Sequence, residues 1–153
     1  MSSLINTING LLAPAKKIPE SLTLLVARIA LATVFWKSAQ TKIASGDFLG
    51  QKWAFYDLSA STTMLFEYEY DLPLIPPEIA AYMATFAEFF LSIFILLGLF
   101  TRLSAFGFLM MTLVIQVFVY PDAWPTHILW AGLLLYVLKE GPGKLSLDRV
   151  LGK

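Results

Sequence analysis

"AAYMATFAEFFLSIFILLGLFT", residues 80–101, contains one charged side chain, Glu88, within a stretch that is otherwise mostly apolar. An α-helix needs about 20 predominantly apolar residues to cross the hydrocarbon core of a bilayer. The stretch has that length, so it predicts a transmembrane helix with a carboxylate near its middle. A charge at that depth is costly unless it has a partner, so the surroundings of Glu88 become the main question about function.

The composition of the whole chain agrees with a membrane protein. Its 153 residues are 58% hydrophobic and only 14% charged, and the mean hydropathy is +0.70. Soluble domains carry about 25% charged residues, and a small chain buries the smallest fraction of its surface. The net charge of zero excludes the basic footprint of a nucleic-acid-binding protein. The absence of cysteine excludes disulfides, thiol catalysis and iron–sulfur ligation by this chain.

The apolar pattern predicts an all-α transmembrane four-helix bundle that forms a single membrane domain over residues 1–153. The expected spans are residues 21–44, 79–100, 103–120 and 124–139. The second and third spans are joined by only two residues, and the third and fourth by a Pro-containing turn. Connections this short favour antiparallel neighbours, which gives an up-down-up-down bundle.

Lysine and arginine residues indicate how the bundle is oriented. Cytoplasmic loops of membrane proteins carry the excess of these residues. One side of the predicted bundle holds most of them: Lys16, Lys17, Arg102, Lys139, Lys144, Arg149 and Lys153. The other side holds Lys42 and Lys52. We therefore expect a multi-pass protein of the bacterial inner membrane with both termini cytoplasmic and an outward-facing, partly ordered segment at residues 45–78.

Three segments outside the spans carry their own patterns. Residues 1–20 predict an N-terminal interfacial helix, with apolar side chains at helical spacing at Leu4, Ile5, Ile8, Leu11 and Leu12. Residues 66–72 alternate between apolar and acidic side chains, which predicts an extended lid over the outer mouth of the bundle. Residues 140–153 form a cytoplasmic tail in which Gly-Pro-Gly breaks the fourth span and a short interfacial turn follows.

Two basic residues of the first span are candidate partners for Glu88. At 1.5 Å per residue, Glu88 lies roughly 14 Å below the outer end of its span, near the midplane, within axial reach of Arg28 and Lys37. Nine residues separate these two bases, which places them on opposite faces of the helix. Lys37 can extend toward the outer interface, so Arg28–Glu88 is the predicted interior pair. Such a pair relays a proton or binds a ligand head group, or it only fixes helix register, and both readings stay open.

Few other side chains are candidates for a site. Gln116 lies in the third span, where it is typical of an interhelical hydrogen bond. His127, the only histidine, is a possible proton carrier, metal ligand or capping residue near the outer boundary. Glu67, Glu69 and Asp71 could attract cations, although a solvated acidic face is the simpler reading. One imidazole without thiols does not make a complete zinc or haem site. His127 and these acids are therefore only weak candidates for metal ligands, and no metal site is expected.

The ordered set of motifs resembles the DoxX family of small four-span membrane proteins. The resemblance rests on Arg28, Phe35, Ser38, Lys42, Glu88, "LLGLFTRLSA" (96–105) and "EGPGKLSLDRVL" (140–151). The family pattern often has Gly where this chain has Ser38. The stretch from Glu69 to Trp130 is similar to a subgroup encoded beside enzymes that modify metal-binding peptides. The resemblance implies that Arg28, Lys42 and Glu88 form the polar set to test.

The resemblance implies two functions, and the residues add a third reading. The first is an accessory subunit of a redox or quinone-linked membrane system, rather than an enzyme by itself. In such a subunit, a quinone head group would contact Glu88, Arg28 or His127. The alternative is a non-enzymatic membrane component for copper or zinc stress or for export of a modified peptide. A bundle whose polar core only sets packing is the third. The lipid bilayer and a protein partner or second copy of the chain are the expected partners.

Overall fold

The computed structural model describes residues 2–152, and 75% of the structure is helical. Its long helices are α2 (Glu20–Lys42), α4 (Pro77–Leu97), α5 (Thr101–Val114) and α6 (Trp124–Glu140). A π-helical turn, Ile115–Val119, continues α5. Within the described residues, three helices are long and apolar enough to cross a membrane: Glu20–Lys42, Pro77–Leu97 and Thr101–Val119. Helix α6, with 17 residues, is shorter.

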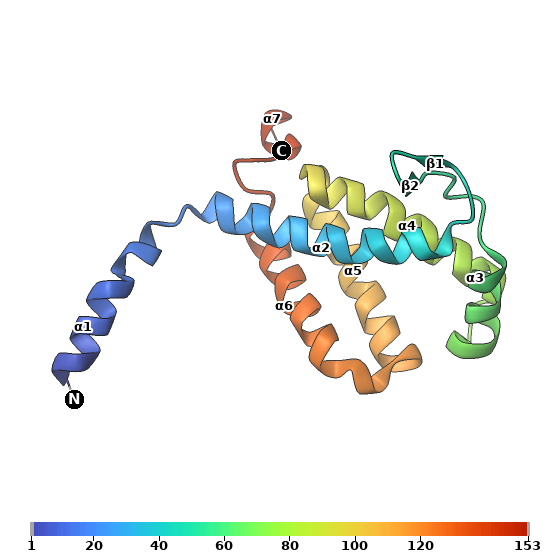
Figure 1. The fold of residues 1–153 in the computed structure, drawn as a ribbon, viewed down its shortest axis with the longest axis horizontal. Coiled ribbons are helices and arrows are strands. Elements are labelled where there is room, and N and C mark those ends of the chain that lie inside the picture. Colours follow the sequence, from blue (N-terminus) through green and yellow to red (C-terminus); the bar gives the residue numbers. More distant parts are fainter. Residues whose placement is uncertain (1, 153) are drawn as a thin grey trace.

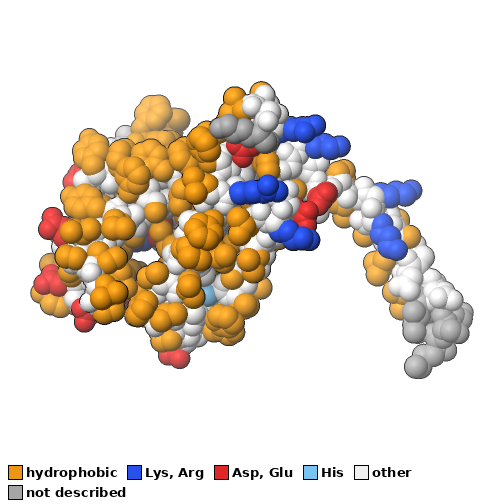
Figure 2. Space-filling model, turned by 180° about the vertical axis from the view of Figure 1, so that it is seen from behind, with side chains coloured by type: hydrophobic (Ala, Val, Ile, Leu, Met, Phe, Trp, Pro, Cys, Tyr) orange, Lys and Arg blue, Asp and Glu red, His pale blue; other side chains and the backbone are white. Residues whose placement is uncertain are grey.

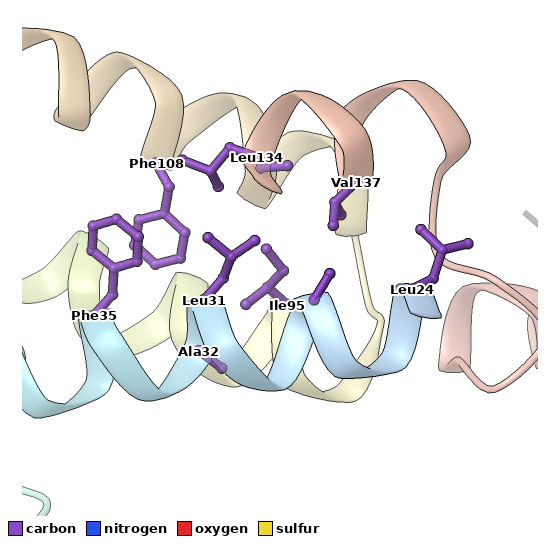
Figure 3. Packing of buried hydrophobic residues seen from close by; sticks show 10 residues of the cluster. Leu24, Leu31, Ala32, Phe35, Ile95, Phe108, Leu134 and Val137 are labelled. Atoms are coloured by element: carbon purple, nitrogen blue, oxygen red, sulfur yellow. The ribbon is translucent and has the colours of Figure 1, made fainter. Parts of the chain in front are cut away.

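The long helices pack around a shared apolar core. Helix α2 lies along α4, α4 lies against α5, and α6 contacts both α5 and α2 (Figure 1). Each of them contributes to the largest cluster of buried side chains, which includes Leu31, Phe35, Ile95, Phe108 and Leu134. Figure 3 shows these side chains converging between the helices, with the rings of Phe35 and Phe108 stacked at a centroid distance of 3.8 Å. The observed helices begin and end within a few residues of the predicted spans.

The connection between α4 and α5 is held by the C-terminal tail. Helix α4 ends at Leu97 and is followed by Gly98, whose φ of +68° favours glycine at a helix C-terminus. Helix α5 has no cap from its own preceding residue. Instead, Asp148 of α7 (Leu147–Val150) accepts hydrogen bonds from the backbone N–H groups of Phe100 and Thr101, both at 2.9 Å. The tail therefore supplies the acidic cap that the short hairpin lacks.

The outer segment between α2 and α4 contains ordered structure that partly contradicts the sequence prediction. It begins with a small hairpin, β1 (Asp47–Phe48) and β2 (Gln51–Lys52), and continues with α3 (Ala60–Leu65). The extended lid predicted over residues 66–72 is wrong, because Phe66–Tyr70 is a π-helical turn that continues α3. Apolar residues at positions 66 and 70 fit a helical spacing as well as an alternating one. Burial of Phe66 against Ala80 and Ala81 of α4 selects the helix.

The N-terminal arm and the charges give the molecule two different ends. Helix α1 (Ser2–Leu12) and a 3-10 turn (Ala13–Lys17) point away from the body and expose Leu4, Leu11 and Leu12 (Figure 1). The predicted N-terminal helix thus exists, whereas Lys153 and the side chain of Ile5 lie outside the described part. Figure 2 shows Lys and Arg side chains gathered at the end that carries this arm, and most Asp and Glu side chains toward the opposite end.

Candidate functional site

The carboxylate of Glu88 is paired with Lys42, not with Arg28. The ammonium Nζ of Lys42 lies 2.9 Å from Oε2 and 3.1 Å from Oε1 of Glu88. Lys42 is only 5% exposed and Glu88 only 3%. Ser38 completes the group: its hydroxyl donates to Oε1 of Glu88 at 2.9 Å and accepts from Lys42 Nζ at 2.7 Å. These three side chains form the polar centre of the molecule.

Helix geometry explains why these three residues meet. Ser38 and Lys42 are four residues apart in α2, so they share one face of that helix. Lys42 is also the last residue of α2, where a cation is favoured by the partial negative charge of the helix C-terminus. Helix α4 packs along α2 and brings the middle of its buried face, which holds Glu88, opposite that last turn. Lys37 is exposed on the other face, as predicted.

The predicted Arg28–Glu88 pair is wrong, because the Arg28 guanidinium binds backbone carbonyls. Its nitrogens donate to the carbonyl oxygens of Ile95 and Leu96 at 2.9 and 2.8 Å, and to those of Pro142 and Leu145 at 2.7 and 2.8 Å. The last carbonyls of a helix lack partners within the helix. Arg28 lies in the N-terminal half of α2, beside the C-terminus of α4. The carbonyls there accept the hydrogen bonds of a guanidinium that is only 1% exposed.

The polar centre forms part of the wall of a cavity of about 340 Å³. The lining is mostly apolar and comes from α2, α4, α5 with its π-helical continuation, α6 and the outer segment. It includes Phe35, Ser38, Lys42, Tyr70, Met83, Glu88, Met111, Tyr120, His127 and Trp130. Figure 2 shows the surface hollowed among hydrophobic side chains. Concave, mostly apolar spaces of this size with a few convergent polar groups are typical of small-molecule sites.

His127 and Gln116, which the sequence proposed separately, are hydrogen-bonded to each other beside this cavity. Nδ1 of His127 lies 2.7 Å from Oε1 of Gln116, and the amide nitrogen of Gln116 donates to the Pro121 carbonyl at 2.7 Å. His127 is 3% exposed and its ring packs against Trp130 with a centroid distance of 5.2 Å. The turn at Pro121–Ala123 folds α6 back on the π-helical turn and creates this contact.

Tyr70 of the outer segment and Tyr120, which follows the π-helical turn after α5, cover part of the cavity. Their rings meet edge to face at a centroid distance of 5.7 Å, and the Tyr120 hydroxyl donates to the carboxylate of Glu69. Glu67, Glu69 and Asp71 are exposed. Across residues 2–152, no group of three or more His, Asp or Glu side chains is arranged to hold a metal ion.

Lys42 and Glu88 both belong to the polar set that the family resemblance implied, but their pairing was not predicted, and Ser38 was not predicted as a member of the centre. The four-residue spacing of Ser38 and Lys42 on one helix face was the available signal. Together, the centre and His127 give the cavity a carboxylate, an ammonium, a hydroxyl and an imidazole in apolar surroundings. Such a set can hydrogen-bond or exchange protons with the head group of an apolar ligand.

Comparison with known proteins identifies the family. The family model named DoxX matches residues 23–121, which is more than half of the chain. This range contains Arg28, Lys42, Glu88 and Gln116, whereas His127 and the tail lie beyond it. No curated protein and no solved structure matches. With a family match over most of its predicted membrane region and three helices suited to a bilayer, this chain belongs to the DoxX family of small membrane proteins.

Proposed function

We propose that this protein is an accessory subunit of a redox or quinone-linked membrane system, and that its cavity binds the head group of a quinone-class ligand. The observation that carries the proposal is the buried Lys42–Glu88 pair, both of whose members line the cavity. A pair that only fixed helix register would be expected to be enclosed by packed side chains. Here the pair borders open space inside an otherwise apolar pocket, which supports a role in binding.

The lining of the cavity supports a flat, lipophilic ligand. The aromatic side chains of Phe35 and Trp130 stand edge to face at 5.6 Å and both contribute to the wall. A ring compound can pack against such faces while its apolar substituent follows the remaining aliphatic wall toward lipid. The polar atoms of Lys42, Glu88 and Ser38 are then the groups that orient the oxygen substituents of the ring.

The same proposal includes the membrane arrangement. We infer that α6 crosses the bilayer as a fourth span, that both termini face the cytoplasm, that α1 lies on the inner surface, and that residues 45–78 face outward from a bacterial inner membrane. The charge separation between the two ends of the molecule supports this orientation. A single membrane domain over residues 1–153 follows from it. The copper or zinc alternative, and a protein partner or second copy of the chain, stay predictions.

The orientation can be tested directly because the chain has no cysteine. Thr63→Cys in α3 and Lys144→Cys in the tail each introduce a single thiol at an exposed position. In intact spheroplasts, a membrane-impermeant maleimide is expected to label the first variant and to label the second only after lysis. Labelling of Lys144→Cys in intact cells, or protection of both positions, contradicts the proposed orientation.

The binding proposal is tested with purified protein in lipid nanodiscs. A decyl-substituted benzoquinone and the corresponding benzohydroquinone are titrated while tryptophan fluorescence is recorded, because Trp130 lies in the cavity wall. We expect saturable quenching by at least one of the two compounds, and at least ten-fold weaker binding to Glu88→Gln, a loss of roughly 1.4 kcal/mol. Lys37→Met, which removes an exposed charge from α2, is the matched control. Absence of saturable binding, or an unchanged affinity in Glu88→Gln, refutes the proposal.

A further inference from the structure

The tautomer of His127 follows from the orientation of the Gln116 amide. A carbonyl oxygen only accepts hydrogen bonds, so the group of Gln116 that contacts the Pro121 carbonyl must be its NH₂. The amide oxygen of Gln116 therefore faces Nδ1 of His127, at 2.7 Å. That oxygen also only accepts, so Nδ1 carries the proton. In the neutral imidazole, Nε2 is then an unprotonated acceptor.

This acceptor has no partner in the protein. Among residues 2–152, no hydrogen bond involves Nε2 of His127, and the residue as a whole is only 3% exposed. The side chain lines the cavity, so the acceptor borders the space in which a ligand would lie. A ligand that covers this acceptor without donating to it loses free energy, whereas a donor group on the ligand would satisfy it.

The polar centre presents a second acceptor to the same cavity. The Lys42 ammonium has three hydrogens, and Ser38 together with the two oxygens of Glu88 provides acceptors for them. Oε1 of Glu88 accepts from Ser38 and Lys42, whereas Oε2 accepts only from Lys42 among the described residues. A carboxylate oxygen has capacity for a further hydrogen bond. At Glu88 and at His127 the cavity therefore offers its occupant two acceptors.

From these two acceptors we propose that the cavity prefers a reduced, dihydroxylated ring over its oxidised form, with one hydroxyl donating to Glu88 and the other to His127. A hydroquinone carries two hydroxyl donors, whereas the corresponding quinone carries two carbonyl oxygens that can only accept. The quinone would leave Nε2 of His127 without a partner and would place its oxygen against the carboxylate. The proposal rests on the proposed function, because it specifies which oxidation state of a quinone-class ligand the same site takes.

The experiment compares the two oxidation states on the wild type and on two variants of His127. Nanodisc-embedded protein is titrated under argon with the decyl-substituted benzohydroquinone, its monomethyl ether and the benzoquinone. In the wild type, we expect the hydroquinone to bind about ten-fold or more tightly than the quinone, because each of its two hydroxyl groups donates a hydrogen bond that the quinone cannot make. The monomethyl ether, which has one hydroxyl donor, is expected to lie between them.

The variants separate hydrogen bonding from packing. His127→Phe keeps an aromatic ring beside Trp130 but removes the acceptor, and it is expected to lower the preference for the hydroquinone over the quinone by about five- to ten-fold. His127→Gln provides an amide oxygen near the position of Nε2 and is expected to recover part of that preference. Circular dichroism melting of both variants tests whether they are folded.

The outcomes distinguish this inference from the proposed function. Equal wild-type affinities for hydroquinone and quinone, or an unchanged ratio in His127→Phe, overturn the preference while leaving a quinone-class site in place. Tighter binding of the quinone overturns it as well. Failure of every compound to bind refutes the proposed function itself, and this inference with it.

Discussion

Replacing Arg28 by Met is expected to detach the C-terminal tail from the helical core without opening the polar centre. Methionine is unbranched and fills much of the space of the arginine stem but donates no hydrogen bonds. The substitution leaves the carbonyls of Pro142 and Leu145, which accept from Arg28 at 2.7 and 2.8 Å, without their donor. Helix α4 loses the donor to its last carbonyls as well.

The size of the effect follows from the two tail contacts. A hydrogen bond to a charged group contributes about 1.5–3 kcal/mol, so two of them give about 3–6 kcal/mol of docking free energy. At about 1.4 kcal/mol per factor of ten, the detached fraction of the tail increases by roughly 10²- to 10⁴-fold. The contacts of Asp148 with the start of α5 remain, and they set the absolute detached fraction that this factor multiplies.

Hydrogen exchange measured by mass spectrometry on residues 146–152 reports this docking. The amide of Asp148 donates to the Gly98 carbonyl at 2.8 Å, so its exchange requires the tail to leave the core. Lys37→Met, which removes an exposed charge from the same helix, is the control and is expected to leave exchange unchanged. Exchange is also measured in Glu88→Gln, which is expected to leave tail docking unchanged, because the described hydrogen bonds of Arg28 all go to backbone carbonyls and the ion pair of Glu88 is with Lys42.

Two results would refute this reasoning. Tail exchange in Arg28→Met that stays within two-fold of the wild type would mean that the carbonyl contacts contribute little to docking. A comparable acceleration in Glu88→Gln would mean that Arg28 depends on Glu88 after all, as the depth arithmetic first indicated. An effect confined to Arg28→Met supports the assignment of this residue to the tail.

Three further substitutions test the packing at the same end and at the polar centre. Gly98→Ala is expected to lower the free energy of unfolding by more than ~1 kcal/mol in thermal melts, since φ is +68° and an added Cβ would lie 2.5 Å from Cβ of Ser146. Asp148→Ala removes the cap of α5 and is expected to cost about 0.5–2 kcal/mol in the same assay; no change would contradict the capping role. Glu88→Leu alone is expected to cost about 3–5 kcal/mol because it leaves the Lys42 ammonium buried without its carboxylate. Adding Lys42→Met is expected to recover most of that loss, and strictly additive losses in the double-mutant cycle would argue against the pair.

Hydropathy predicted the helices well because bilayer thickness and backbone hydrogen bonding leave few alternatives. A chain with long apolar stretches must satisfy its backbone within helices, so length and composition alone locate α2, α4 and α5 with its continuation. The tail and the outer segment were harder. Residues 66–70 alternate in polarity over too few positions to separate a strand from a helical turn. Packing of Phe66 against α4 favours the helical turn.

The partner of Glu88 could not be predicted because the acceptors of Arg28 are backbone carbonyls, which the side-chain pattern does not reveal. Helix ends also expose carbonyl oxygens, and their positions depend on where α4 stops and where the tail returns. Neither is visible in a hydropathy pattern. The contact between His127 and Gln116, 11 positions apart, required the turn at Pro121–Ala123 to fold α6 back, although the proline there was an available signal.

The two buried cations of α2 therefore serve different purposes, and their chemistry explains the division. Arg28 has five N–H donors in a planar fork on which several carbonyls converge, and Asp148 of the tail interacts with it electrostatically, which suits a structural contact between helix and tail. Lys42, a compact ammonium 14 residues later and roughly 21 Å along the helix, neutralises Glu88 beside a cavity. Variants of Arg28 are thus expected to change stability first, whereas conservative variants of Glu88 change what the cavity binds. A loss of cellular function in an Arg28 variant would by itself say nothing about the ligand, because a misplaced tail also uncaps α5.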